Sequence, residues 1–170
     1  MTGLAPNPIS QALAAGVVAR RLAERGDVRH AMGLLCQALQ LAPEAPLLTG
    51  AESWLTVDNL RALGARSLRR FILTVASLAA STPAPGLRGN GRVSNLRAGA
   101  RLLGRGRVCF PDEGRLYVGE AFVLDKLGDL DGKVSVARDA ARRFPLHWGG
   151  HGVMLALAQR SARVPLRVVG

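Results

Sequence analysis

The residues best suited to chemistry in this 170-residue chain are few and widely spaced. His147 and His151 are four residues apart, which would place two imidazoles on one helix face, where they could share a metal ion. Gly149 and Gly150 between them weaken such a helix, and no carboxylate or thiol lies close by in the sequence. No stretch matches a nucleophile elbow or a metalloprotease helix. We therefore expect a protein that is not an enzyme, with no catalytic residue, no metal site and no cofactor.

The two cysteines and one acidic pair are assigned to structure. Cys36 and Cys109 have no partner motif, and each falls at a position typical of a helix interior. We expect reduced core residues there, with a disulfide or a metal role as the alternatives. Asp112 and Glu113 follow Pro111, and a negative charge is stabilising at the start of a helix, next to the positive end of the helix dipole.

Arginine gives the chain a second kind of chemistry, the binding of anions. The formal net charge is +11, and ten arginines but no acidic residue fall between Asp58 and Asp112. Arg97, Arg101 and Arg105 are spaced to share one helix face, which predicts a basic stripe with no compensating carboxylate. Such a stripe could hold an acidic protein, a nucleic-acid backbone or an anionic membrane surface. Lysine occurs only twice, so the alternative is an arginine excess that reflects codon bias on a solvated face.

Two segments that must position these side chains have the pattern of helical hairpins. Residues 9–43 and 114–145 each contain apolar residues at helical spacing on both sides of a Gly-Asp turn. Glycine readily takes the left-handed conformation that ends a helix, aspartate caps the next helix, and proline cannot continue it. These three residues are Gly26, Asp27 and Pro43 in the first hairpin, and Gly128, Asp129 and Pro145 in the second.

The two hairpins resemble the tetratricopeptide repeat (TPR) family. Pro43 and Pro145 are 145 − 43 = 102 residues apart, three times the roughly 34-residue period of TPR arrays. Pro111 falls one such period before Pro145. Small residues, Ala19 and Ala121, occupy the positions where paired helices of the family approach each other. The resemblance covers residues 9–43 and 114–145 well, 94–111 partly, and the remainder poorly.

The sequence also departs from the family pattern. Lys133 stands where the first hairpin has Ala31, Gly99 and Gly106 replace alanines, and the usual aromatic of the first helix is Ala15. The repeat register fails before residue 94, where a strict count asks for three helices and the residues indicate two helices and a loop. Which repeat has been remodelled therefore stays open.

The fold class that follows is all-α, with antiparallel αα-hairpins stacked as a short right-handed TPR-like solenoid with one irregular loop; an unrelated helical bundle is the alternative. We expect a disordered N-terminus at 1–8, the repeat domain at 9–162 and a tail at 163–170. The loop is placed at 82–92 by its prolines and glycines. Residues 147–163 resemble a terminal capping helix.

The most apolar stretch, residues 67–81, is expected to be a buried helix. Its uncharged run of eleven residues is too short for a bilayer span, which needs roughly 20. Arg69 and Arg70 before an apolar run are also typical of a twin-arginine export signal, but such signals are N-terminal and this stretch follows other helices. We therefore expect no transmembrane segment and a cytoplasmic protein.

The TPR resemblance implies a non-catalytic scaffold that binds a peptide or helix of a partner protein in a groove lined by the first helix of each hairpin. It does not identify the partner or the oligomeric state. The groove positions lack the lysine and asparagine set with which some TPR domains hold a C-terminal carboxylate, so a chaperone terminus is not the expected ligand. The alternative is nucleic acid or another polyanion bound to the basic stripe. The implied groove residues are Leu13, Gly16, Arg20, Arg115, Val118, Phe122 and Asp125.

Overall fold

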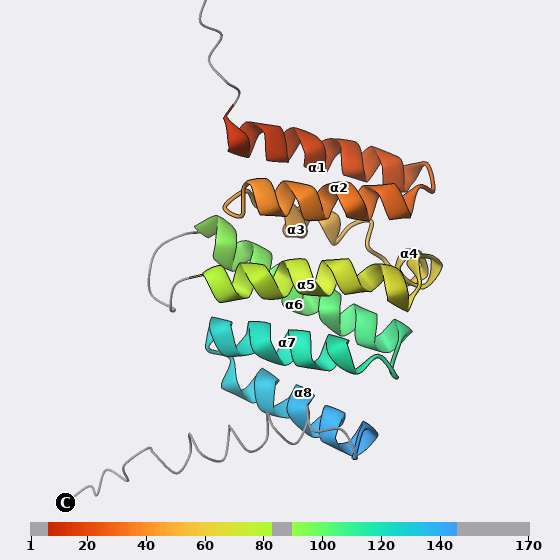
Figure 1. Ribbon diagram of the computed structural model, residues 1–170, viewed down its shortest axis with the longest axis vertical. Coiled ribbons are helices and arrows are strands. Elements are labelled where there is room, and N and C mark those ends of the chain that lie inside the picture. The colour runs from red at the N-terminus through yellow and green to blue at the C-terminus, as the bar shows by residue number, and fades with distance from the viewer. Residues whose placement is uncertain (1–6, 83–89, 146–170) are drawn as a thin grey trace, which may run out of the picture.

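The computed structural model describes residues 7–82 and 90–145, and these residues form eight α-helices and no strand. The predicted all-α fold class is therefore confirmed for the described part of the chain. Figure 1 shows the helices lying across the long axis of the molecule, from α1 at one end to α8 at the other. The helices are α1 Pro8–Glu24, α2 Val28–Leu41, α3 Leu47–Ala51, α4 Val57–Leu63, α5 Ala65–Ser81, α6 Asn90–Cys109, α7 Gly114–Leu127 and α8 Leu130–Arg143.

The first and last hairpins, α1/α2 and α7/α8, share the same turn structure. Gly26 and Gly128 have φ of +87° and +75°, a left-handed conformation that glycine adopts without a steric penalty. The carboxylate of Asp27 accepts a hydrogen bond from the backbone N–H of His30, and Asp129 caps α8 in the same way. The turn chemistry predicted for both hairpins is confirmed.

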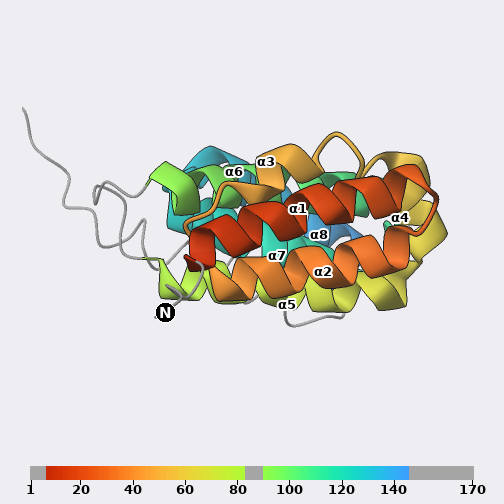
Figure 2. The ribbon, with the colours of Figure 1, turned by 90° about the horizontal axis from the view of Figure 1, so that it is seen from above.

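The helices lie in two layers. α1, α3 and α6 pack in that order in one layer, and α2, α5 and α7 pack in that order in the other. Figure 2 shows α1, α3 and α6 on one side of the molecule and α2 and α5 on the opposite side. The two short helices α3 and α4 both contact α2 and α6, and together they fill the place of one helix.

The layer arrangement separates the two first helices of the matching hairpins. Three helical positions lie between the hairpins: α3 with α4, then α5, then α6. Because this number is odd, α7 lies in the layer of α2 and not in the layer of α1. The matching sequences therefore have matching local structures in different tertiary positions.

α6 is held against the turn after α2 by a buried asparagine. Asn95 is fully buried, and its amide nitrogen donates to the carbonyl oxygens of Pro43 at 3.0 Å and Ala45 at 2.7 Å. Its side-chain oxygen accepts from the backbone N–H of Leu48 at 3.0 Å. One side chain thus satisfies three backbone groups of a turn some 50 residues away in sequence, which fixes where α6 begins in the stack.

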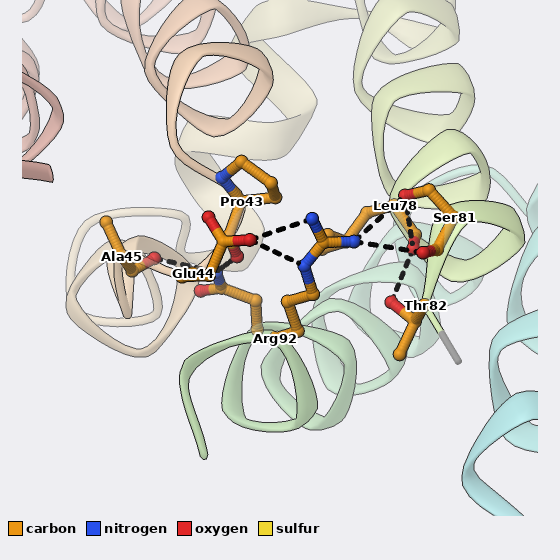
Figure 3. Close-up of polar contacts among 8 residues, drawn as sticks. Pro43, Glu44, Ala45, Leu78, Ser81, Thr82 and Arg92 are labelled. Carbon is orange, nitrogen blue, oxygen red and sulfur yellow. Dashed lines mark hydrogen bonds and ion pairs between the residues drawn. The ribbon is translucent and has the colours of Figure 1, made fainter. Parts of the chain in front are cut away.

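A neighbouring arginine joins three segments at the same place. The Arg92 guanidinium donates to the Glu44 carboxylate at 2.8 Å and to the carbonyl of Ser81, at the end of α5, at 3.0 Å (Figure 3). α6 already begins at Asn90, so the last three residues of the loop predicted at 82–92 are helical. Gly91 lies so close to this turn that a Cβ would fall 1.6 Å from the Glu44 carbonyl oxygen.

The stretch predicted as a buried helix is most of α5. Leu68, Phe71 and Val75 are buried there, which confirms the prediction. Among the described residues, no helix is both long and apolar enough to cross a membrane. Cys36 is a buried free thiol as predicted, whereas Cys109 is a free thiol that is only half-buried. Burial raises the pKa of both thiols.

The predicted N-terminal segment and C-terminal elements lie mostly outside the described residues. Of the segment expected to be disordered, Asn7 and Pro8 are described: the Asn7 side chain caps α1, and Pro8 is its first residue. The capping helix at 147–163, the tail at 163–170, and the pair His147 and His151 all fall outside the described ranges.

Candidate functional site

A groove between α5, α7 and α8 is built on the close parallel packing of α5 and α7. A Cβ on Gly119 of α7 would lie 3.1 Å from the Ile72 side chain of α5, so the two helices approach closely there. Further along, the Lys126 ammonium donates to the Thr82 carbonyl at 3.5 Å. The later residue of one segment, Thr82, thus contacts the later residue of the other, Lys126, so α5 and α7 run parallel.

α8 forms the opposite wall of this groove. It returns antiparallel along α7 after the Gly128 turn. The ring of Phe144, just after α8, packs edge-on against Tyr117 of α7 with the ring centroids 5.4 Å apart. The end of α8 is thereby fixed beside the start of α7, and the groove between α5 and α8 has α7 as its floor.

The groove has a volume of about 880 Å³ and a mainly apolar lining. Leu73 is 69% exposed, Val118 47% and Phe122 38%, although all three are large apolar side chains. Exposed apolar residues gathered in one place, rather than scattered singly, mark interaction surfaces. The apolar lining comprises Ile72, Leu73 and Ala76 of α5, Val118 and Phe122 of α7, Ala140 of α8, and Phe144.

One end of the groove is charged. The exposed side chains of Arg69 and Arg115 line it together with Asp112 and Glu113. Asp112 forms an ion pair with Arg143 at 2.9 Å, and the Glu113 carboxylate caps α7 by accepting from the backbone N–H of Arg115. The two carboxylates thus have partners, while the Arg69 and Arg115 guanidinium groups have no polar partner among the described residues. Glu113 confirms the helix-capping role predicted for the acidic pair, which Asp112 does not share.

The structure brings together only some of the predicted groove residues. Arg115, Val118 and Phe122 line the groove. Leu13 and Arg20 lie on α1, which packs against α2 and α3 and not against α5, α7 or α8. The reason is the odd number of helical positions described above, which puts α1 and α7 in opposite layers.

The other predicted groove positions have structural partners. Arg20 pairs with Glu24 at 2.9 Å on the surface of α1, and the Asp125 carboxylate accepts from the Lys133 ammonium at 2.7 Å. Gly16 faces α3, because a Cβ there would lie 2.9 Å from the Leu47 side chain.

The α5 side of the groove, Arg69 and Leu73, was missed by the sequence analysis. The missed signal is the width of the apolar run in 67–81. Ile72 and Leu73 are adjacent, so they cannot share one narrow stripe of a helix. Ile72 is 5% exposed and faces the core, while Leu73 is turned outward.

The basic stripe on α6 is not free of carboxylates, and that prediction was wrong. The Arg101 guanidinium makes two hydrogen bonds to the Glu52 carboxylate, at 2.6 and 2.9 Å, and they hold the pKa of Glu52 below its ordinary value. Arg105 donates to the carbonyl oxygens of Glu52 and Leu55 at 2.8 and 3.1 Å. Glu52 precedes Asp58 and so lies outside the acid-free segment on which the prediction was based. Arg97 is exposed and has no polar partner among the described residues.

The buried carboxylate of Glu120 on α7 likewise has a structural role, because it links neighbouring helices. Glu120 is buried and forms an ion pair with Arg107 of α6, whose guanidinium also lies 5.0 Å from the Tyr117 ring centroid. Arg107 extends the network to Asp139 of α8 at 3.6 Å. Burial raises the pKa of Glu120 despite its arginine partner. The cluster joins α6, α7 and α8.

Within residues 7–82 and 90–145, no three His, Cys, Asp or Glu side chains come together in a way that could hold a metal ion. Comparisons of the chain with protein-family models, with curated proteins and with solved structures give no match. We therefore infer the function from the geometry and charge of the groove.

Proposed function

We propose that this chain is a non-catalytic scaffold that binds a helix or peptide of a partner protein in the groove between α5, α7 and α8. The helical stack, which we regard as a remodelled TPR-like array, would serve to hold α5 and α7 parallel and α8 beside them. Its glycine-aspartate turns and the period between Pro43 and Pro145 support the TPR-like interpretation.

One observation carries the proposal. Leu73, Val118 and Phe122 come from two helices far apart in sequence, yet all three are exposed in the same 880 Å³ groove. Leaving them in water costs roughly 25 cal/mol per Å² of apolar surface, which an occupant of the groove would recover. In protein interfaces, a few side chains packed into well-desolvated pockets carry most of the free energy of binding.

The polyanion alternative has weaker support. Arg101 forms an ion pair with the Glu52 carboxylate at the end of α3, and Arg105 donates a hydrogen bond to the Glu52 carbonyl oxygen. Of the three arginines in the predicted stripe, Arg97 alone has no polar partner among the described residues. Nucleic-acid binding draws its affinity from several phosphate contacts at once and weakens steeply with salt. Retention on nucleic acid that falls by orders of magnitude between low and moderately high salt would favour this alternative.

The proposal is tested by a pull-down from the native host with the full chain and three variants. Val118→Arg and Phe122→Arg place a charge in the groove, and Val17→Arg on α1 is the matched control because Val17 is 54% exposed, close to the exposure of Val118. We expect wild type and Val17→Arg to recover the same partner and both groove variants to lose it. Recovery of the same proteins by all four would show that the groove is not the site.

A further inference from the structure

We propose that the partner segment is an amphipathic helix of a separate, acidic protein, whose apolar face fills the groove and whose carboxylate binds Arg69 and Arg115. This inference rests on the proposed function and specifies the chemistry of the partner. It follows from the backbone of the groove walls, from the position and free charge of the two arginines, and from the charge of the chain itself.

The walls of the groove favour a helical occupant. All three walls are helices, whose backbone groups are bonded internally, and the described residues include no strand edge. An extended peptide would therefore find no backbone partners along the groove, whereas a helix satisfies its own N–H and C=O groups. Apolar side chains spaced along one face of such a helix could contact Leu73, Val118 and Phe122.

The two arginines mark a single end of the groove. Arg69 precedes the apolar lining residues of α5, and Arg115 precedes those of α7. α5 and α7 run parallel, and Ile72 lies against Gly119. Arg69 and Arg115, which come shortly before these two residues, therefore lie at the same end of the groove. An occupant thus meets a charged end, where Arg69 and Arg115 lie with Asp112 and Glu113, and an apolar remainder.

The charge at this end is available to an external carboxylate. Asp112 and Glu113 are engaged by Arg143 and by the start of α7, whereas the exposed Arg69 and Arg115 side chains have no polar partner among the described residues. Two guanidinium groups at one end of an apolar groove match a partner that carries Asp or Glu at one end of its apolar face. Charge-assisted hydrogen bonds of this kind are short and directional, so they would set the orientation of the bound helix.

The chain is a poor source of this carboxylate. Its net charge is +11, so a second copy would bring like charge to the groove. Residues 146–170 contain Arg160, Arg163 and Arg167 and no acidic residue. The charge complementarity therefore points to a different, acidic protein.

A display library of random helix-length peptides, selected on the immobilised full chain, tests this inference. We expect enriched peptides to have apolar residues at helical spacing with Asp or Glu at one end. Their affinity, measured by fluorescence anisotropy, should fall about tenfold for the double variant Arg69→Glu, Arg115→Glu and stay unchanged for Val17→Arg. Peptides with the acid changed to Lys should bind the double variant better than the parent peptides do. If circular dichroism shows that this variant is unfolded, Arg69→Gln with Arg115→Gln replaces it, with a smaller loss expected.

The outcomes distinguish this inference from the proposed function. Apolar peptides without an acid preference, which lose binding to Val118→Arg but not to the arginine variant, would overturn the inference and leave the groove as the site. Peptides that bind Val118→Arg as well as wild type, or no enrichment at all, would overturn the proposed function itself. A last selection uses the double variant Leu155→Asp, Leu157→Asp, which places charges in the chain's own C-terminal residues. If peptides are enriched on this variant but not on wild type, the C-terminal residues occupy the groove themselves, and the inference of a separate partner is overturned.

Discussion

The hairpins α1/α2 and α7/α8 have the same Gly-Asp turn and the same aspartate cap on the second helix, but they differ in their interiors. Positions 102 residues apart correspond, and there the alanine pair Ala23 and Ala31 of the first hairpin becomes Asp125 and Lys133 in the second. Ala31 is fully buried, and Lys133 is 8% exposed and bound to Asp125 at 2.7 Å. The lysine at position 133 is therefore accompanied by its own carboxylate partner, at the position that corresponds to Ala23.

The hairpins also differ in what surrounds them. α1 is the end helix of its layer and packs against α2 and α3, whereas α7 packs against α5, α6 and α8. In the second environment, exposed apolar side chains lie between helix walls as a groove. A repeated sequence thus specifies the hairpin, and the helices between the copies decide what surface each hairpin presents.

The largest effect is expected from placing the second hairpin's lysine in the first. Ala31→Lys buries an ammonium group with alanine at the position of its carboxylate, and an uncompensated buried charge costs about 3–5 kcal/mol. Urea unfolding followed by circular dichroism measures the loss. Adding Ala23→Asp should restore about 1 kcal/mol or more. A double variant no more stable than Ala31→Lys would show that the first hairpin cannot accommodate the aspartate–lysine pair of the second.

The next effect concerns the contact that holds the start of α6 against the turn after α2. Asn95→Ala leaves two carbonyls and one N–H of the turn after α2 without their buried partner, which we expect to lower the free energy of unfolding by about 2–3 kcal/mol. Ser94→Ala is the control, because its hydrogen bond to Thr49 is exposed and should change stability by less than about 0.5 kcal/mol. Equal losses in chemical denaturation would contradict the role given to Asn95.

A smaller effect separates the members of the basic stripe. Arg105→Ala removes two hydrogen bonds to backbone carbonyls and should cost about 1 kcal/mol, whereas Arg97→Ala should be neutral within about 0.5 kcal/mol. Thermal unfolding of both variants gives the comparison. If Arg97→Ala proved the more destabilising of the two, the structural role assigned to Arg105 would be wrong.

The smallest effects are opposite pH dependences at two arginine-paired carboxylates. The folded-state pKa of Glu52 lies below its ordinary value of 4.5, so this residue adds stability as pH rises toward 4.5 and loses it as pH falls. The folded-state pKa of Glu120 lies above 4.5, so this residue removes stability as pH rises through the interval above 4.5. Glu52→Gln should therefore flatten the rise in stability below pH 4.5, and Glu120→Gln should relieve the loss above it. Urea titrations across this range measure both slopes, and slopes that change in the same direction would contradict the assignment.

Local structure could be predicted from the sequence because its causes are local. The turns at Gly26 and Gly128 and the caps at Asp27 and Asp129 depend on two or three neighbouring residues. The buried helix at 67–81 followed from its composition. These features needed no knowledge of which helices touch.

The site could be predicted only in part, because its other half depends on contacts between distant residues. Val118 and Phe122 were predicted as groove residues from their place in a hairpin, whereas Leu73 lies beside them only because α5 packs against α7. Glu52 neutralises Arg101 from 49 residues away. A single sequence does not show which of its charged residues will be in contact. The structure therefore gives Arg101 and Arg105 partners that the sequence did not reveal.

The most direct test of the groove is an amide chemical-shift map of the isotope-labelled full chain, recorded with and without the highest-affinity selected peptide. We expect the largest shift changes on α5 and α7 around Leu73, Val118 and Phe122, and no change on α1 around Leu13 and Val17. Largest changes on α1, or on the Arg97 face of α6, would contradict a binding site between α5, α7 and α8.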